Sequence, residues 1–339
     1  MTNYKKKGNL QLRGRALYLE DQPSIFFIGH FAIDTIIRFH KKNKPTLGGS
    51  VSFGSLSLRT YTDNVKISII SNIGSLNFDE SLLEVVKNKN IDLTGLKWSK
   101  TNNTNFVLDY FNHSRSLTLK TRSPNLNFND IPKDYIINPP DVIVLVPLCL
   151  EISYEYVLRI KEHFPDSYIS IDLQGFIRKI ENGHVSVVRE EKIISNLEKI
   201  IKLIGVKLIL KGSEDEMKIL SGKDDIYEAM DHFNYVKFKG IFIMTLGESG
   251  SLIVKKGQKI LKVPAFKSKG SKDETGAGDV YFAIFLYEFI CSDKSWQSIE
   301  KAAYLASAAA SFNVEKVGPA GFVSKEEVLN RVNEKKYIK

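Results

Sequence analysis

The residues best suited to chemistry lie in one short segment, 273–279, which reads Asp-Glu-Thr-Gly-Ala-Gly-Asp. Glycines on both sides of Ala277 allow a tight turn, so successive backbone N–H groups can point one way at the start of the apolar stretch that follows. The positive end of a helix dipole at this place would favour an anion. We therefore expect the amides of Gly276, Ala277 and Gly278 to hold a transferring phosphoryl group. Asp279 would accept a proton from a hydroxyl, and the combination indicates a kinase.

A simpler interpretation of the same segment is a loop that ends in a helix cap, for which Asp279 is a suitable residue. Two familiar nucleotide-binding loops do not fit. A dinucleotide fingerprint needs its third glycine where Tyr281 stands, and the chain has no G-x-x-x-x-G-K run followed by Ser or Thr.

Composition describes an ordinary globular chain with a basic head. The chain has 339 residues, 43% of them hydrophobic, which is enough for one large α/β domain or two smaller ones. The net charge is +9, and +5 of it precedes Glu20, on Lys5, Lys6, Lys7, Arg13 and Arg15. We interpret residues 1–23 as a solvated extension and expect neither a nucleic acid nor a membrane as partner, although RNA or lipid binding by the head is the alternative.

The cysteines and the apolar runs indicate a cytoplasmic protein. Only two cysteines occur, Cys149 and Cys291, and neither belongs to a Cys-x-x-Cys pair, which fits a reducing compartment and argues against a disulfide framework. No apolar run approaches the roughly 20 residues of a membrane helix, and the head lacks the apolar core of a signal peptide. Six scattered histidines show no metal-binding spacing.

Strand-like and helical patterns alternate through much of the chain. A continuous apolar strand is predicted at 24–29, and further strands at 142–146, 168–171, 206–210 and 241–246 alternate with helices at 151–164, 193–204 and 214–220. This order predicts an α/β fold with a parallel sheet between two helical layers. Ligands of such folds bind at the carboxyl ends of the strands, and Asp34 lies just beyond the first strand.

Two segments depart from this alternation. Residues 35–39 and 105–120 resemble short antiparallel strands, the latter with a turn at 112–114. They predict a small β-sheet, drawn from about 35–47 and 100–121, that would act as a lid and exclude water. Such a sheet could pair with a second copy to form a homodimer. The alternative is a β-excursion with no gating role.

These residues resemble the PfkB, or ribokinase-like, family of small-molecule kinases, over roughly Ser24 to Phe322. The resemblance implies a three-layer α/β/α domain at 24–331 with a central, mostly parallel sheet. It implies that Asp279 is the catalytic base and that Gly276, Ala277 and Gly278 form the anion hole. It also implies ATP as the phosphoryl donor.

Four further matches follow the family order. Gly48-Gly49 is similar to the family's diglycine, and Asp34 resembles the aspartate that binds substrate hydroxyls. Ser213-Glu214-Asp215-Glu216 is similar to the Asn-x-x-Glu motif, whose Glu216 would organise Mg²⁺ through water. Residues 245–250 match a turn beside the nucleotide. The nucleotide-binding residues implied are Ser213, Thr245, Gly247, Gly250, Thr275 and Gly278.

Departures from the family pattern point to the acceptor. Ser213 replaces the usual Asn, Glu274 adds a carboxylate, and Phe53 stands where many sugar kinases have Asn. The segment from Gly48 to Phe53 resembles the inositol-kinase branch more than ribokinase. Gln174 could reach the substrate and Arg178 a phosphate, or either could be structural.

The resulting hypothesis is a kinase that phosphorylates a hydroxyl of a small polyol or sugar, with a nucleoside as the alternative acceptor. Asp34, Gly48, Gly49, Phe53, Gln174 and Arg178 would bind that acceptor. From another class, the chain could be a sensor that binds a small molecule without turning it over. The intact segment from Gly276 to Asp279 argues against a sensor, which needs no base.

Overall fold

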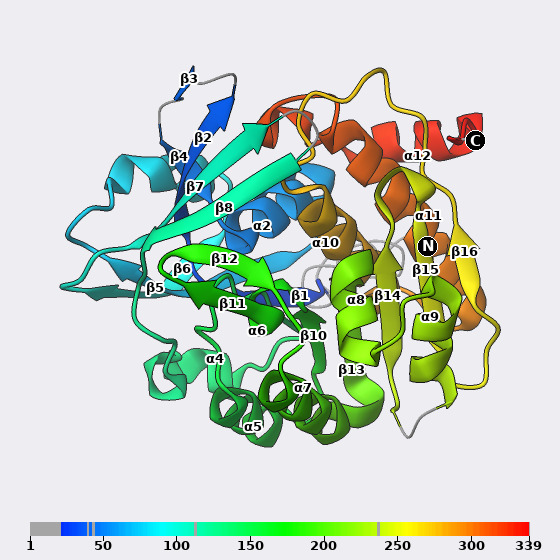
Figure 1. Ribbon diagram of the computed structural model, residues 1–339, viewed down its shortest axis with the longest axis horizontal. Helices are drawn as coiled ribbons and strands as arrows, with labels where there is room; N and C mark the ends of the chain where they lie inside the picture. Colours follow the sequence, from blue (N-terminus) through cyan, green and yellow to red (C-terminus); the bar gives the residue numbers. More distant parts are fainter. Residues whose placement is uncertain (1–21, 39–40, 43–44, 112–113, 236–237, 339) are drawn as a thin grey trace, which may run out of the picture.

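A computed structural model describes residues 22–38, 41–42, 45–111, 114–235 and 238–338, so most of the basic head and part of the predicted turn at 112–114 lie outside it. The described chain forms two β-sheets, one large and one small, with helices packed on both faces of the large one (Figure 1). No described helix combines the length and apolarity needed to cross a bilayer.

The large sheet has nine strands in the order β16-β15-β14-β13-β10-β9-β1-β5-β6. Strands from β14 to β6 run parallel, and β15 and β16 add an antiparallel edge. The central strands are continuously apolar because helices cover both faces. The bounds are β1 Ser24–Ile28, β5 Lys66–Gly74, β6 Asp92–Ser99, β9 Val142–Leu145, β10 Tyr168–Asp172, β13 Leu208–Ser213, β14 Ile241–Thr245, β15 Ser251–Lys255 and β16 Leu261–Val263.

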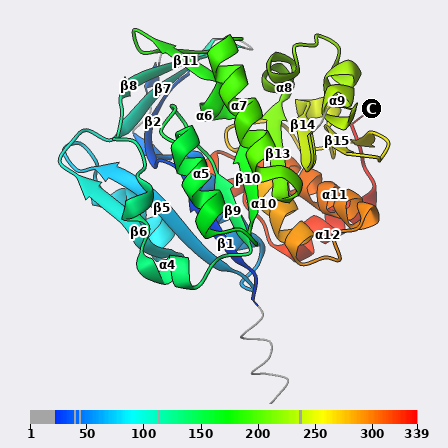
Figure 2. The same cartoon turned by 90° about the horizontal axis from the view of Figure 1, so that it is seen from below.

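Two helical layers bury separate apolar clusters against the two faces. One layer holds α2 Ser50–Tyr61, α10 Ala277–Ile290, α11 Trp296–Asn313 and α12 Lys325–Glu334. The other holds α4 Lys133–Ile137, α5 Tyr154–His163, α7 Glu191–Ile204, α8 Glu214–Ser221 and α9 Ile226–Tyr235 (Figure 2). Short helices complete the chain: α3 Glu84–Lys87, α6 Gln174–Ile177, η1 Glu80–Leu83, η2 Phe128–Asp130, η3 Gly205–Lys207, η4 Gly247–Ser249 and η5 Gly318–Gly321.

The predicted alternation of strands and helices is confirmed, with shifts at its ends. The strand predicted at 206–210 is β13, which begins at Leu208 because Gly205–Lys207 form a 3₁₀ turn. The sequence analysis predicts no helix at the position of α2, whose sequence is rich in serine. Ser52, Ser55 and Ser57 donate their hydroxyls to carbonyls three or four residues earlier in the chain, so this helix is buried despite its composition.

The small sheet has seven strands, in the order β11-β12-β8-β7-β2-β3 with β4 paired to β2. The antiparallel pair predicted at 105–120 is confirmed as β7 Thr104–Phe111 and β8 Ser114–Thr121. The segment predicted at 35–39 is longer, since β2 spans Ala32–Arg38, and its pairing with β7 is parallel. The short strands β3 Lys41–Lys42 and β4 Thr46–Gly48 pair with β2.

Two strands of the small sheet escaped prediction: β11 Arg178–Glu181 and β12 His184–Val187. Asn182 and Gly183 between them both have positive φ, 51° and 82°. An Asn-Gly pair in this conformation is the usual two-residue hairpin turn, so the sequence did carry a signal for it.

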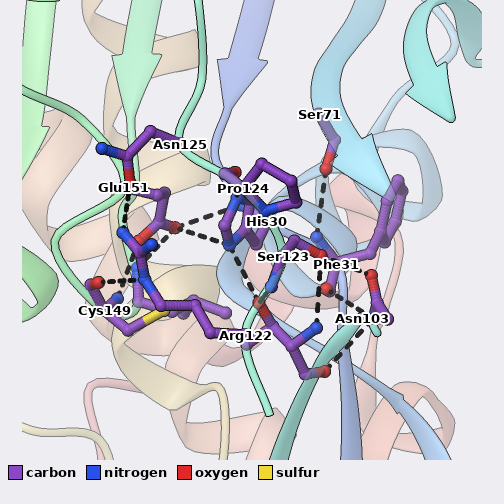
Figure 3. Close-up of polar contacts among 12 residues, drawn as sticks. His30, Phe31, Ser71, Asn103, Arg122, Ser123, Pro124, Asn125, Cys149 and Glu151 are labelled. Carbon is purple, nitrogen blue, oxygen red and sulfur yellow. Dashed lines mark hydrogen bonds and ion pairs between the residues drawn. The ribbon is translucent and has the colours of Figure 1, made fainter. Parts of the chain in front are cut away.

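A buried polar cluster joins the two sheets where β1 ends and β2 begins (Figure 3). The carboxylate of Glu151, 0% exposed, accepts hydrogen bonds from three backbone N–H groups. Its Oε1 accepts from Leu148 at 2.8 Å and from His30 at 3.2 Å, and its Oε2 accepts from Cys149 at 2.7 Å. The glutamate therefore ties the loop after β9 to the chain leaving β1.

The His30 ring connects this carboxylate to the small sheet. Its Nε2 lies 2.9 Å from the carbonyl of Pro124 and its Nδ1 lies 2.9 Å from the hydroxyl of Thr104, the first residue of β7. A carbonyl can only accept, so Nε2 carries the proton and Nδ1 accepts from Thr104. Burial lowers the pKa of His30 and keeps the ring neutral, against the opposing effect of Glu151.

His30, Cys149 and Glu151 also have the residue types of a metal site, with candidate ligand atoms within 4.8 Å of one another. Both Glu151 oxygens and both His30 nitrogens already make hydrogen bonds to the protein. The cluster is therefore satisfied as a structural joint.

We expect Glu151→Gln to destabilise the fold by about 2–4 kcal/mol, because an amide NH₂ would replace an oxygen that accepts from a buried N–H. Urea denaturation measures the free energy of unfolding. The same substitution at the exposed Glu155 should change it by no more than about 0.5 kcal/mol. Equal effects of the two substitutions would contradict the role of the joint.

Candidate active site

The carboxyl ends of the central strands and one face of the small sheet enclose a cavity of about 300 Å³. Twelve residues predicted to act in catalysis or binding line it: Asp34, Gly49, Phe53, Gln174, Arg178, Ser213, Glu216, Thr245, Thr275, Gly276, Gly278 and Asp279. Residues more than 240 positions apart in the chain thus face one space. Eight further lining residues were not predicted: Ala32, Ser50, Phe106, Leu108, Leu117, Leu148, Asp172 and Lys211.

Asp279 stands in the first turn of α10, which the Gly-Ala-Gly segment begins. Desolvation by the surrounding protein and the negative charge of Asp172 raise the pKa of Asp279 to about 6, against the effect of Lys211 and of a hydrogen bond from Ser50. A carboxylate with this pKa is ionised at neutral pH and is a stronger base than an ordinary aspartate.

The backbone before Asp279 offers amide donors to the cavity. Gly276 has φ +80°, and a Cβ there would lie 2.0 Å from Cδ1 of Phe53, so only glycine fits. The ring of Phe53 in turn packs edge-on against Phe322. Phe53 therefore packs directly against the turn at Gly276 and also lines the cavity.

One predicted donor of the cradle is already engaged. The N–H of Ala277 donates to the carbonyl of Glu274 at 3.2 Å, which closes the turn. Within the part of the chain that the structure describes, the N–H groups of Gly276, Gly278 and Asp279 make no such bond. The expected donor set of Gly276, Ala277 and Gly278 is thus corrected to Gly276, Gly278 and Asp279.

The two glycines of the diglycine make space for Asp34 and for the backbone of His30. A Cβ on Gly48 would lie 1.9 Å from Oδ2 of Asp34, so this glycine makes room for the carboxylate, and Gly48 is not among the lining residues. Gly49 has φ +91°, and a Cβ there would meet the His30 carbonyl at 2.5 Å. Gly48 therefore makes room for Asp34, and its expected contact with a substrate stays a prediction.

A chain of hydrogen bonds leads from Arg178 to Asp279. Arg178 donates to Oε1 of Gln174 at 3.2 Å, and Gln174 Nε2 donates to Oγ of Ser50 at 2.6 Å. The Ser50 hydroxyl in turn bonds the carboxylate of Asp279. Arg178 is anchored by a 2.7 Å bond to the carbonyl of Leu148. Both Gln174 and Arg178 thus line the cavity and orient Asp279 as well.

A buried ion pair lies at the carboxyl ends of β10 and β13. Nζ of Lys211 is 2.7 Å from Oδ2 of Asp172, and the two residues are register partners on adjacent parallel strands. Burial alone would lower the pKa of Lys211, but Asp172 and Asp279 outweigh it and raise this pKa above its ordinary value. Neither residue was predicted as a site residue, because their pairing depends on the register of two strands that are distant in the sequence.

Ser213 and Glu216 form a capping box at the start of α8. The Ser213 hydroxyl accepts from the Glu216 N–H at 3.4 Å, and Glu216 Oε2 accepts from the Ser213 N–H at 2.8 Å. A serine in place of the usual Asn therefore serves as a helix cap. Burial and the charge of Asp172 raise the pKa of Glu216.

The oxygens in this region suit a hard divalent cation. Oδ1 of Asp172 is buried and has no hydrogen-bond partner among the described residues, and Glu216 lines the same cavity. Carboxylate oxygens are what Mg²⁺ binds, often through its own waters. Glu216 and Asp172 are thus the residues that would hold it.

The remaining predicted nucleotide residues divide into two groups. Thr245 and Thr275 line the cavity, but Gly247 and Gly250 do not. Gly247–Ser249 form a 3₁₀ turn, in which the Gly250 N–H donates to the Gly247 carbonyl. A Cβ built on Gly250 would lie 2.0 Å from the carbonyl oxygen of Val263, so no side chain fits there. These two glycines shape a turn outside the cavity.

The wall opposite the carboxylates is apolar. Phe106 and Leu108 of β7 and Leu117 of β8 come from the small sheet, and Leu148 follows β9. Leu108 and Leu117 are register partners, so they point to the same side of the hairpin. The cavity therefore offers one polar face and one that contacts hydrocarbon.

Comparison with known proteins shows what the chain is similar to in sequence and fold. The chain is 27% identical over 332 residues to an uncharacterized sugar kinase of Pyrococcus horikoshii, covering 89% of this chain and 93% of the relative. The structure of that relative in complex with ATP matches with a TM-score of 0.71 at 24% identity, over 91% of this chain and 99% of the other.

Two other solved structures share the fold. A pyrophosphate-dependent kinase of the ribokinase family, bound to a pyrophosphate analogue and myo-inositol, matches with a TM-score of 0.73 at 22% identity, over 90% of this chain and 99% of the other. Fructokinase from Vibrio cholerae, bound to fructose, ADP and calcium, matches with a TM-score of 0.72 at 17% identity, over 92% and 99%.

The sequence pattern of the pfkB family carbohydrate kinases matches residues 62–326, which include the capping box, Lys211 and the whole segment from Asp273 to Asp279. The diglycine and Asp34 precede the matched residues, and the fold brings them to the same cavity. Sequence pattern, fold and cavity agree that this chain is a kinase that belongs to the pfkB family of carbohydrate kinases.

Proposed function

We propose that the protein transfers the γ-phosphoryl group of ATP to a hydroxyl of a small polyol or sugar, of the myo-inositol or hexose type. The observation that carries this proposal is the placement of Asp279, with its raised pKa, beside free amide donors and in the same cavity as Asp34. A base, an anion cradle and a hydroxyl-binding carboxylate are the groups that phosphoryl transfer to an alcohol requires.

The two faces of the cavity favour a ring polyol as acceptor. Asp34, Gln174 and Arg178 offer acceptors and donors for hydroxyl groups, while Leu108 and Leu117 offer a surface for C–H groups. A volume of about 300 Å³ is at the small end for ligand sites, so an acceptor of monosaccharide size fits best. Inositol and fructose are the acceptors bound in two proteins of the same fold.

The transfer follows from the positions of the side chains. Asp279 takes the hydroxyl proton as the acceptor oxygen bonds to the γ-phosphorus, and the bond from that phosphorus to the leaving oxygen breaks, so that its electron pair stays with ADP. The amides of Gly276 and Gly278 stabilise charge on the equatorial oxygens. Mg²⁺ near Glu216 and Asp172 would offset negative charge on the donor. The apolar wall limits access of competing water.

The first test is an acceptor screen. We expect turnover with one of the inositols, hexoses or keto-deoxy acids, with nucleosides as the comparison class, measured as ADP release with ATP and Mg²⁺. Parallel reactions with pyrophosphate, the donor named for one structural neighbour, report the donor preference. Saturable ligand binding with no transfer from either donor would favour a non-catalytic sensor instead.

Asp279→Asn should lower kcat by about 10³-fold, within the range that a general base contributes. The variant should unfold at the same temperature as the wild type or slightly higher, because a desolvated carboxylate is replaced by a neutral amide. Asp224→Asn, the same change at an exposed site, should leave kcat unchanged. Near-normal turnover by Asp279→Asn would remove this residue from the role of base.

The pH profile of kcat/KM should show an acidic limb near pH 6. The base acts when ionised, so activity is complete above the raised pKa of Asp279, about 6, and falls tenfold per pH unit below it. Ser50→Ala removes a hydrogen bond that lowers this pKa, and the limb should therefore move to higher pH. A limb that stays in place in Ser50→Ala would mean that another group, such as the donor phosphate, titrates.

A further inference from the structure

Lys211 is a buried charged residue to which the transfer described above gives no part. It lies on β13, two residues before Ser213, and it is 6% exposed. Its hydrogen bond to Asp172 Oδ2, at 2.7 Å, uses one of the three N–H donors of an ammonium group. Within the described residues no second hydrogen bond of Nζ is recorded.

The ammonium of Lys211 lies directly beside the anion cradle. A Cβ built on Gly278 would stand 3.1 Å from Nζ, which is a tight contact for a Cβ. Gly278 is one of the two cradle glycines whose N–H groups are free. The absence of a side chain at Gly278 therefore opens the space between this amide and the ammonium.

More acidic than basic side chains line the cavity, so a phosphate that enters it needs a nearby cation. Four carboxylates line the cavity and contribute four negative charges when ionised, while Lys211 and Arg178 contribute two positive ones. A donor phosphate brings more negative charge into this space, and repulsion by the carboxylates opposes its approach. Lys211 and Arg178 both interact with the charges of Asp279 and Glu216, and Lys211 is the one that lies beside Gly278.

A contribution to the stability of the fold is a weak explanation for the buried ion pair of Lys211 and Asp172. A buried ion pair can usually be replaced by apolar residues of similar size with little loss of stability, whereas removal of one partner is costly. Lys211 and Asp172 are the charged residues of two neighbouring strands, and they meet where ligands of parallel sheets bind.

We propose that Lys211 is a catalytic residue whose ammonium binds the phosphoryl group in transit, together with the amides of Gly276 and Gly278. This inference rests on the proposed kinase function. Lys211 keeps its proton throughout: the acceptor proton goes to Asp279, the new O–P bond forms, and the old one breaks toward ADP. The lysine supplies only charge and N–H donors, which are worth most where the transition state spreads charge over the phosphoryl oxygens.

Asp172 is the positioning residue for this lysine. Its Oδ2 accepts from Nζ, and the same oxygen lies 3.5 Å from Nε2 of Gln174, so the ammonium is held at a fixed place beside the polar chain that orients Asp279. We expect Asp172→Asn to lower kcat while the KM for the acceptor stays unchanged.

The test separates catalysis from charge balance by a paired substitution. Lys211→Met should lower kcat by about 10²- to 10³-fold, the effect of removing one transition-state donor. It also leaves Asp172 unpaired, so a lower melting temperature is expected. The double variant Lys211→Met with Asp172→Asn removes both charges, and its melting temperature should return toward that of the wild type.

Comparison of the double variant with Asp172→Asn alone decides between the two roles, because both lack the Asp172 carboxylate. A catalytic Lys211 predicts that kcat of the thermally stable double variant stays well below that of Asp172→Asn. Binding of ATP without acceptor, followed by calorimetry, should weaken as well. Recovery of kcat in parallel with the melting temperature would overturn the proposal and leave the lysine a charge-balancing role.

A matched control lies at the other end of the same strand. Lys207, just before β13, is partly buried and bonds the carbonyl of Asp166 at 2.9 Å. Lys207→Met should leave kcat unchanged. If the wild type transfers phosphate and the double variant retains full activity, only the role of Lys211 is refuted. If the wild type is inactive on every acceptor, the kinase function itself is refuted.

Discussion

Burial of like charges is the constraint on which the active site depends. Asp172, Glu216 and Asp279 are gathered in one cavity because the carboxyl ends of parallel strands and the start of α10 meet there. Water cannot fully solvate carboxylates in such a place, so the pKa values of Asp279 and Glu216 are raised. Lys211, Arg178 and the hydrogen bond from Ser50 keep Asp279 ionised near neutral pH, and a base in this state can still accept a proton.

The same constraint accounts for the rigidity of the surroundings. Gln174 bonds both Ser50 and Arg178, and Arg178 is fixed to the Leu148 carbonyl. Leu148 in turn donates its N–H to Glu151, so the cavity wall is held by the buried joint beneath the small sheet. The pKa values of these groups depend on the distances between their charges. The continuous set of hydrogen bonds holds those distances fixed.

The contact of the two sheets determines the shape of the acceptor space. The large sheet and its helices supply Asp172, Lys211 and Asp279 to the cavity, and the small sheet supplies apolar side chains from β7 and β8. His30 joins these parts through Thr104 and Glu151. A neutral histidine suits this position, because burial disfavours the charged form of the ring.

Local sequence was sufficient to single out Asp279 and the glycines around it, because a tight turn at a helix start depends on neighbours within a few residues, whereas Glu216 was singled out by its resemblance to the family's Asn-x-x-Glu motif. The α/β alternation was predictable for the same reason, since the period of apolar residues is a local property. By contrast, Ser50, Asp172 and Lys211 gain their roles from strands and helices that meet only in the fold, and Ala277 loses its expected role to a single carbonyl. Tertiary structure alone decided which polar residues share a cavity, because desolvation and ion pairing act through space and leave no pattern along the chain.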